Sequence, residues 1–323
     1  MMATSFSDNL SRSPEGAPAV VIAEAGAGGL GWWALALGGI YAWGVVASTA
    51  MQIEIASSVQ LLAPLVVLGA IFIVYGRFRP NKNIQLASGV LVMITGSAIL
   101  AGIISNAGLR LRRPLIDAFL SRADHALGLD TPALVLAFVG HPILNEALSL
   151  AYLSAVPIMF FTAVWFAVRG QTERVWEIGW GFSVCILLCA IISIHYPAIG
   201  NFAHANLEGV PGRGLPAGSG TYHLVAFRSL HEGTEPILDL RQMGGLVTFP
   251  SFHVIMPLIV VWAFRGCAKA VWVASIWGIA VVVSTIPIGG HYVIDLAGGV
   301  LLWLGTAAIY ANHTAKHSLT MKR

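Results

Sequence analysis

Charged side chains are scarce in this chain of 323 residues: they make up 10% of it, whereas about 25% is usual in a soluble domain. Hydrophobic residues make up 57%, and the mean hydropathy is +0.78. The chain is too apolar for a soluble globular domain, so the composition predicts a polytopic membrane protein. Basic clusters interleaved with aromatic residues are also missing, and the net charge is only +3. This excludes nucleic acid as a partner.

Cysteine is almost as rare. Cys185 and Cys189 lie inside an apolar segment, and Cys267 lies in a short basic turn. Their spacing matches no disulfide framework and no set of metal ligands, so they are expected to be small core residues. The first 28 residues lack the basic start and clean apolar run of a signal peptide. Residues 1–28 are rich in Ser, Ala, Gly and Pro, which predicts a disordered cytoplasmic tail.

Long apolar runs are abundant. A helix needs about 20 apolar residues to cross a bilayer. The sequence therefore predicts an all-α membrane helix bundle of about eight spans, between seven and nine, because the sixth run is short and residues 132–142 are compatible with a partial re-entrant helix. One integral membrane domain is expected over residues 29–323, with an outer loop at 199–250. The runs cover residues 29–49, 58–76, 85–107, 143–168, 176–198, 251–265, 269–287 and 291–311.

Basic residues are distributed unevenly between the two sides that these spans define. One side carries eleven basic and five acidic residues, and the other carries seven basic and ten acidic residues. Short loops rich in Lys and Arg stay in the cytoplasm. Both termini are therefore predicted to be cytoplasmic, and the starts of the spans at 251 and 291 to face outward. The eleven are Arg12, Arg77, Arg79, Lys82, Arg169, Arg174, Arg265, Lys269, Lys316, Lys322 and Arg323.

Two outer segments contain polar residues without an assigned role. Segment 108–130 has roughly helical spacing and is predicted to lie along the outer interface. Its Arg113 either contacts a lipid phosphate or extends toward water as an interfacial side chain, and the second interpretation is favoured. Four histidines on this side match no metal spacing and are expected to be solvated or packed: His195, His204, His223 and His231.

A His and an Asp interrupt the apolar run Ser284–Gly299. His291 and Asp295 are four residues apart, so in a helix the carboxylate lies close enough to hold one imidazole nitrogen. Gly289 and Gly290 allow the backbone to approach a ligand, and the amides of the following helix start suit an anion. The pattern favours a phosphate site. The alternative is a His–Asp pair that is merely satisfied in a membrane core.

A second polar group lies at Thr248–His253. Pro250 and Ser251 are typical of a helix start, where free amides and the positive helix end favour an anion. The predicted topology sends this helix inward and returns the next one outward. His253 and His291 are therefore expected at the same membrane face.

These two motifs resemble signatures of the type-2 phosphatidic acid phosphatase superfamily. Ser284, Thr285, five residues, His291, three residues and Asp295 reproduce the spacing of the third signature, and Pro250–His253 is similar to the second. The forms around them look closest to the branch that includes inositol phosphorylceramide synthases. The similarity covers about residues 200–311 and implies a six-helix phosphatase-like core, with the catalytic part at 143–311.

The sequence departs from the superfamily pattern at its cations. Thr285 stands in place of the phosphate-binding Arg, and the first signature is missing, since Asn106 occupies the position of its Lys ahead of Arg113. Another cation must then neutralise the phosphate. By analogy with the synthase branch, Arg228 is the first candidate, followed by Arg213, Arg241 and Arg113.

The resemblance implies a metal-independent mechanism with no cofactor. His291 would attack phosphorus, Asp295 would hold its other nitrogen, and His253 would protonate the leaving oxygen. Phosphate-binding roles fall to Arg228, Ser251, Gly289 and Gly290. The expected substrate is a lipid phosphate or phospholipid of the bilayer. Two alternatives stay open: a metal-dependent hydrolase using both histidines and the Asp, and a non-catalytic protein that binds or transports lipid phosphates.

Overall fold

The structure, a computed structural model, describes residues 27–246 and 248–320. The predicted N-terminal tail lies outside the described residues except for its last two positions. A helix forms at each of the eight predicted spans. They are α1 (Ala27–Thr49), α2 (Ile55–Arg77), α3 (Lys82–Leu109), α6 (Pro142–Val168), α7 (Thr172–His195), α10 (Phe252–Ala263), α11 (Ala268–Ser284) and α12 (Val293–Thr320).

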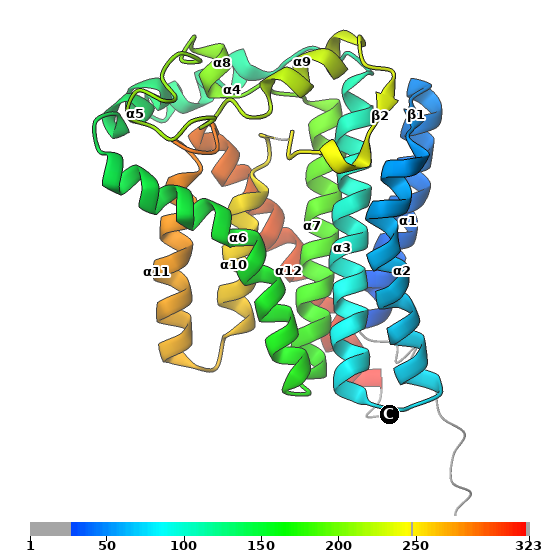
Figure 1. Cartoon of the computed structure of the whole chain (residues 1–323). Helices are drawn as coiled ribbons and strands as arrows, with labels where there is room; N and C mark the ends of the chain where they lie inside the picture. The colour runs from blue at the N-terminus through cyan, green and yellow to red at the C-terminus, as the bar shows by residue number, and fades with distance from the viewer. Residues whose placement is uncertain (1–26, 247, 321–323) are drawn as a thin grey trace, which may run out of the picture.

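The length of these helices confirms the predicted all-α membrane bundle. Within the described residues, six of them are long and apolar enough to cross a membrane, while α10 and α11 are shorter apolar helices of 12 and 17 residues. The region considered for a re-entrant helix instead forms α5 (Thr131–Phe138). It has eight residues and lies at one end of the bundle (Figure 1).

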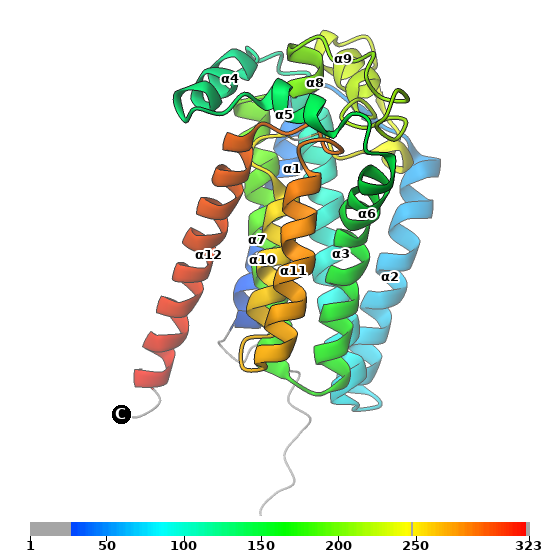
Figure 2. The ribbon, with the colours of Figure 1, turned by 90° about the vertical axis from the view of Figure 1, so that its left-hand side faces the viewer.

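Short elements gather at that same end, as both views show (Figures 1 and 2). They are α4 (Asp117–Ala126), α5, α8 (Asn201–His204), α9 (Leu224–Glu232), the 3-10 helix η1 (Leu240–Gln242) and two short strands. Strand β1 (Gln52–Ile53) pairs in parallel with β2 (Ile237–Leu238), so the outer loop is fastened to the chain between α1 and α2. The start of α1 and the end of α12 lie at the opposite end of the bundle.

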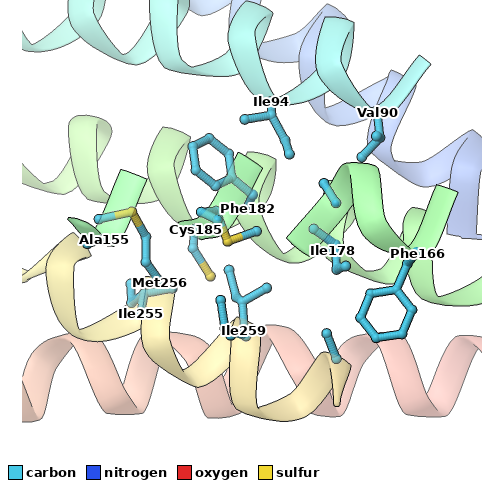
Figure 3. Close-up of a cluster of buried hydrophobic side chains, with 14 of the residues drawn as sticks. Val90, Ile94, Ala155, Phe166, Ile178, Phe182, Cys185, Ile255, Met256 and Ile259 are labelled. Carbon is cyan, nitrogen blue, oxygen red and sulfur yellow. The ribbon is translucent and has the colours of Figure 1, made fainter. Parts of the chain in front are cut away.

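Six helices share one hydrophobic core, part of which appears in Figure 3. Its buried residues come from α3, α6, α7, α10, α11 and α12, and α7 lies centrally among them. Two glycines let α7 approach its neighbours closely. A Cβ at Gly181 would lie 2.8 Å from Trp303, and one at Gly179 would lie 2.8 Å from Met93. Small residues at such crossings are typical of packed membrane helices. The core thus includes α3, which precedes the predicted catalytic part.

Candidate active site

The starts of α10 and α12 bring both predicted histidines together at the end of the bundle that carries the short helices. His253 is in the first turn of α10, and His291 lies two residues before α12 begins. Ser251, which lies two residues before His253, has its hydroxyl 3.3 Å from Nε2 of His291. The structure therefore places His253 and His291 at the same end of the bundle, as predicted. Helix α10 leads away from this end and α11 returns to it.

His291 is held on both sides of its ring. Its Nδ1 lies 3.2 Å from Oδ2 of Asp295, and its Nε2 lies 3.3 Å from the hydroxyl of Ser251. The imidazole is 3% exposed and the carboxylate is fully buried. Because the carboxylate accepts a hydrogen bond from Nδ1–H, Nε2 is left with the lone pair that faces the start of α10.

The spacing suggested that His291 and Asp295 share one face of a helix. In the structure they are in contact, but His291 lies outside the helix. His291 and Tyr292 precede α12, and Asp295 reaches back from the first turn. Oδ2 of Asp295 also accepts the backbone N–H of Tyr292 at 3.0 Å. One carboxylate oxygen therefore fixes both the imidazole and the peptide that carries it.

Ser251 connects the two helix starts. It is the N-cap residue of α10, but its side chain makes no capping hydrogen bond and its hydroxyl lies against His291 instead. Its backbone N–H donates to the carbonyl oxygen of Asp295 at 3.0 Å. Gly298 and Gly299 on α12 allow this approach, since a Cβ would meet the ring of Phe249 at 2.9 Å and the carbonyl of Ser251, respectively.

His253 has a different environment from His291. Its ring stacks on Tyr152 of α6, with centroids 4.0 Å apart and an angle of 12° between the planes. It is partly exposed, and its side chain makes no hydrogen bond with the described residues. The hydroxyl of Tyr152 lies 3.2 Å from that of Tyr222 in the outer loop. Stacking sets the plane of the ring and leaves its nitrogens free to exchange a proton.

Gly289 and Gly290 are close-packed against the protein itself. A Cβ at Gly289 would lie 2.7 Å from the carbonyl oxygen of Thr285, and one at Gly290 would lie 2.9 Å from Cα of Gly220. Gly290 also has a φ of 78°, a conformation that favours glycine. The close approach that these glycines allow is thus to the protein backbone, and their predicted contact with phosphate stays a prediction.

The expected anion site at the start of α12 is filled by a protein carboxylate. Asp124 of α4 accepts the N–H of Val293 at 2.9 Å and that of Ile294 at 2.8 Å, and it also accepts the hydroxyl of Thr131. The expectation that these amides bind a substrate anion is therefore wrong. A carboxylate from elsewhere in the chain already satisfies them and the positive helix end.

A second aspartate of α4 supports the site from the other side. Asp117 accepts the N–H groups of Ile199 and Gly200, each at 2.9 Å, and the hydroxyl of Tyr292 at 3.0 Å. Burial and this carboxylate raise the pKa of Tyr292, so the phenol stays a donor. Sequence analysis missed both aspartates. At their spacing Asp117 and Asp124 share a helical face with Leu120, which the structure buries fully, but the spacing alone does not distinguish a buried face from an exposed one.

Three of the candidate cations, Arg228, Arg241 and Arg113, can be located by their contacts. The guanidinium of Arg228 pairs with Glu208 at 2.5 Å on the surface, and Arg241 pairs with Asp239 and Glu54. Arg113 lines a cavity of about 410 Å³ beside His195 and Tyr196. The described contacts of these arginines do not include the two histidines or Asp295.

Thr285, which stands at the position of the superfamily Arg, is fully buried. Its hydroxyl donates to the carbonyl of Val282 at 2.6 Å, within the last turn of α11. Thr285 therefore ends a helix and contributes no charge. Among residues 27–246 and 248–320, no group of three or more His, Cys, Asp or Glu side chains is placed to hold a metal ion.

A family model described as PAP2 superfamily matches residues 118–309, more than half of the chain. The match begins in α4 and includes every residue of the site except Asp117, while α1, α2 and α3 precede it. No curated protein and no solved structure matches the chain.

Proposed function

The chain belongs to the PAP2 superfamily, whose members are phosphatases, and on this premise we propose that it is an integral membrane lipid phosphatase or lipid phosphotransferase. One observation carries the proposal. His291 has its Nδ1 held by Asp295, while its Nε2 faces Ser251 at a helix start without a side-chain cap. This is the arrangement that a histidine nucleophile needs beside an anion.

In the proposed reaction, Nε2 of His291 attacks the phosphorus and the bond to the leaving oxygen breaks. Asp295 stabilises the positive charge that develops on the imidazole. His253, whose nitrogens are not committed to other groups, protonates the leaving oxygen. Ser251 and the first amides of α10 donate to the phosphoryl oxygens, and each such donor is worth about 3 kcal/mol in comparable sites. Water then gives a phosphatase, and a lipid or sugar hydroxyl gives a phosphotransferase.

A lipid substrate fits the position of the site. His253 lies in the first turn of α10, and α10 begins at the end of the bundle that carries the short helices, so a lipid in the bilayer would present its phosphate at this level. The forms Phe249–His253 and Gly289–Asp295 resemble those of inositol phosphorylceramide synthases, which favours an alcohol as acceptor. This branch assignment is part of the proposal.

The catalytic test uses detergent-purified protein with a panel of lipid phosphates and phospholipid donors. Release of phosphate, or transfer to an added alcohol, is expected with at least one of them. The His291→Ala variant provides the blank. If the panel is bound but never turned over, the non-catalytic lipid-binding alternative replaces the proposal.

We also propose that the site faces outward and that both termini are cytoplasmic, because the basic residues concentrate at the opposite end. The test needs a Cys267→Ser background, since Cys267 is exposed. A cysteine at the exposed Ala217 should then react with a membrane-impermeant thiol reagent in intact cells, whereas one at the exposed Pro80 should not. The reverse labelling would overturn the orientation.

A further inference from the structure

His223 is a buried histidine beside the site to which the mechanism assigns no role. It is 3% exposed and lies at the N-cap position of α9. Its Nε2 lies 2.8 Å from the carbonyl oxygen of Ile199. A carbonyl only accepts, so Nε2 carries the proton and Nδ1 carries the lone pair. Nδ1 is buried and has no hydrogen-bond partner among the described residues.

A single peptide group connects His223 to Asp117. The carbonyl of Ile199 accepts from His223, and the N–H of Gly200, which belongs to the same peptide, donates to Oδ1 of Asp117 at 2.9 Å. The carboxylate polarises this peptide and makes its carbonyl a better acceptor, because hydrogen bonds in a chain strengthen one another. Asp117 therefore stabilises positive charge on His223 without touching the ring.

The same segment brings His223 close to Gly290, the residue that precedes the proposed nucleophile. Gly200 has a φ of 104°, and a Cβ there would lie 3.2 Å from the carbonyl oxygen of Gly290 and 3.7 Å from Nε2 of His223. The backbone N–H of Asn201 donates to that carbonyl of Gly290 at 3.0 Å. The outer loop is thus packed on the residue that precedes His291. Burial and the proximity of His291 lower the pKa of His223, so the ring rests in its neutral form.

We propose that His223 is the base for the second half of the reaction and accepts the proton of the hydroxyl that attacks phosphorylated His291. The inference rests on the proposed function. The O–H bond of the acceptor breaks and its proton goes to Nδ1 of His223. The oxygen bonds to phosphorus as the bond between phosphorus and Nε2 of His291 breaks, and that electron pair returns to the imidazole. The acceptor is a hydroxyl compound, either water or an alcohol.

This assignment gives the two histidines beside His291 separate tasks. His253 is partly exposed and has no hydrogen bond that fixes its tautomer, which suits proton donation to a leaving group. His223 has its proton fixed on Nε2, so its buried Nδ1 can only receive one. A substrate whose leaving group needs no proton therefore separates the two functions.

The test compares His223→Gln with His231→Gln in the full-length protein in detergent. Gln keeps a donor for the carbonyl of Ile199 but has no basic nitrogen. His231 is the matched control, because it lies on the same helix and its Nε2 contacts the carbonyl of Arg113 at 3.0 Å. The probe is nitrophenyl phosphate with radioactive phosphorus, and water alone is compared with added glycerol, so that free phosphate and phosphorylated glycerol distinguish the two acceptors.

The wild-type protein and His231→Gln should turn over steadily. His223→Gln should release a burst of about one nitrophenolate per protein, accumulate an acid-labile phosphoenzyme, and then turn over about 10²-fold more slowly or less, as loss of a general base predicts. Hydroxylamine, whose nitrogen attacks before it loses a proton, should discharge the phosphoenzyme of His223→Gln at the wild-type rate.

Three results would overturn the inference: turnover of His223→Gln equal to that of His231→Gln, loss of the burst in a His223→Gln protein that elutes and melts like wild type, or no rescue by hydroxylamine. The second result would make His223 a support for His291. A wild-type protein that hydrolyses the probe without forming a phosphoenzyme would instead disprove the proposed function, and the inference with it.

Discussion

The starts of α10 and α12 lie side by side, but among the described residues only the start of α12 is capped by a carboxylate. At α12, Asp124 accepts the N–H groups of Val293 and Ile294. At α10, the side chain of the N-cap residue Ser251 makes no capping hydrogen bond, and its hydroxyl lies against His291. Two helix starts that look alike in sequence therefore differ in structure: a protein carboxylate neutralises one, and the other is, in the proposed function, the place where the substrate anion binds.

The start of α12, which Asp124 neutralises, positions the side chains of Asp295 and His291. Hydrogen bonds to charged groups contribute about 1.5–3 kcal/mol each, and the buried carboxylate of Asp124 accepts several. They anchor the first turn of α12, which carries Asp295 and, through it, His291. The start of α10 lacks a side-chain capping hydrogen bond, which is worth about 1 kcal/mol, and in the proposed function its amides bind the substrate instead. The comparison can be tested one residue at a time.

The largest effect should come from the histidines that belong to the two starts. His291→Ala should abolish activity on every substrate, because no nucleophile remains. His253→Ala should be most damaging with a lipid alkoxide leaving group and should be partly relieved by an activated phenolic phosphate, which departs without a proton. Single-turnover measurements on both substrate types distinguish these outcomes. If His291→Ala kept the phenolic reaction and His253→Ala lost it, the two roles would be reversed.

The next largest effect should come from replacing the arginine that neutralises the phosphate. A helix end contributes about half an elementary charge, which does not neutralise a phosphate. We therefore expect Arg228→Ala to lower kcat/KM by at least about a hundredfold with normal expression, and Arg113→Ala to cost much less. Arg228 pairs with Glu208 on the surface, so Glu208→Gln should leave activity intact or raise it. Equal and mild losses for both arginines would assign the cation elsewhere.

Replacing Ser251 at the start of α10 should lower activity, whereas replacing Asp124 at the start of α12 should lower thermal stability. Ser251→Ala should lower kcat by about a hundredfold, as loss of one phosphoryl donor does, with little change in Tm. Asp124→Asn should lower Tm clearly, because an amide cannot accept both N–H groups of α12 equally well. Its effect on kcat should be smaller than that of Ser251→Ala. Thermal unfolding and initial rates of the same preparations test whether one variant loses mainly kcat and the other mainly Tm. Equal losses of kcat and of Tm in the two variants would refute the prediction.

Much of the fold could be predicted because hydrophobicity alone specifies it. Eight apolar runs gave eight helices, and the alternation of their directions placed His253 and His291 at one end. The uncertain element was α5, since the apolar run at 132–142 did not reveal whether it enters the bundle. Run length predicts spans well, but it is uninformative for segments of eight residues.

The site was predictable where its contacts are local and was not where they are distant in sequence. The pair His291 and Asp295 is four residues apart, so spacing sufficed. Asp124 meets Val293 across 169 residues, and Asp117 meets Tyr292 across 175. Their segment looked like an amphipathic helix at the interface, where acidic residues are ordinary. Nothing in the local pattern says that these two carboxylates are buried against α12.

The smallest effect should test how closely the two starts must approach. Gly299 lies against the carbonyl of Ser251, so the Cβ of Gly299→Ala would push the start of α10 away from α12. Gly305 on the same helix has nothing within 4 Å of an added Cβ, which makes Gly305→Ala the matched control. Alanine favours a helix over glycine by about 1 kcal/mol at most, so the control should keep its activity and gain slightly in Tm. Gly299→Ala should lose about tenfold in kcat/KM, because a small displacement of Ser251 weakens its contact with His291 and with the phosphate. Wild-type activity in Gly299→Ala would mean that the distance between the two starts is not part of the catalytic geometry, and the contrast between them would then concern stability alone.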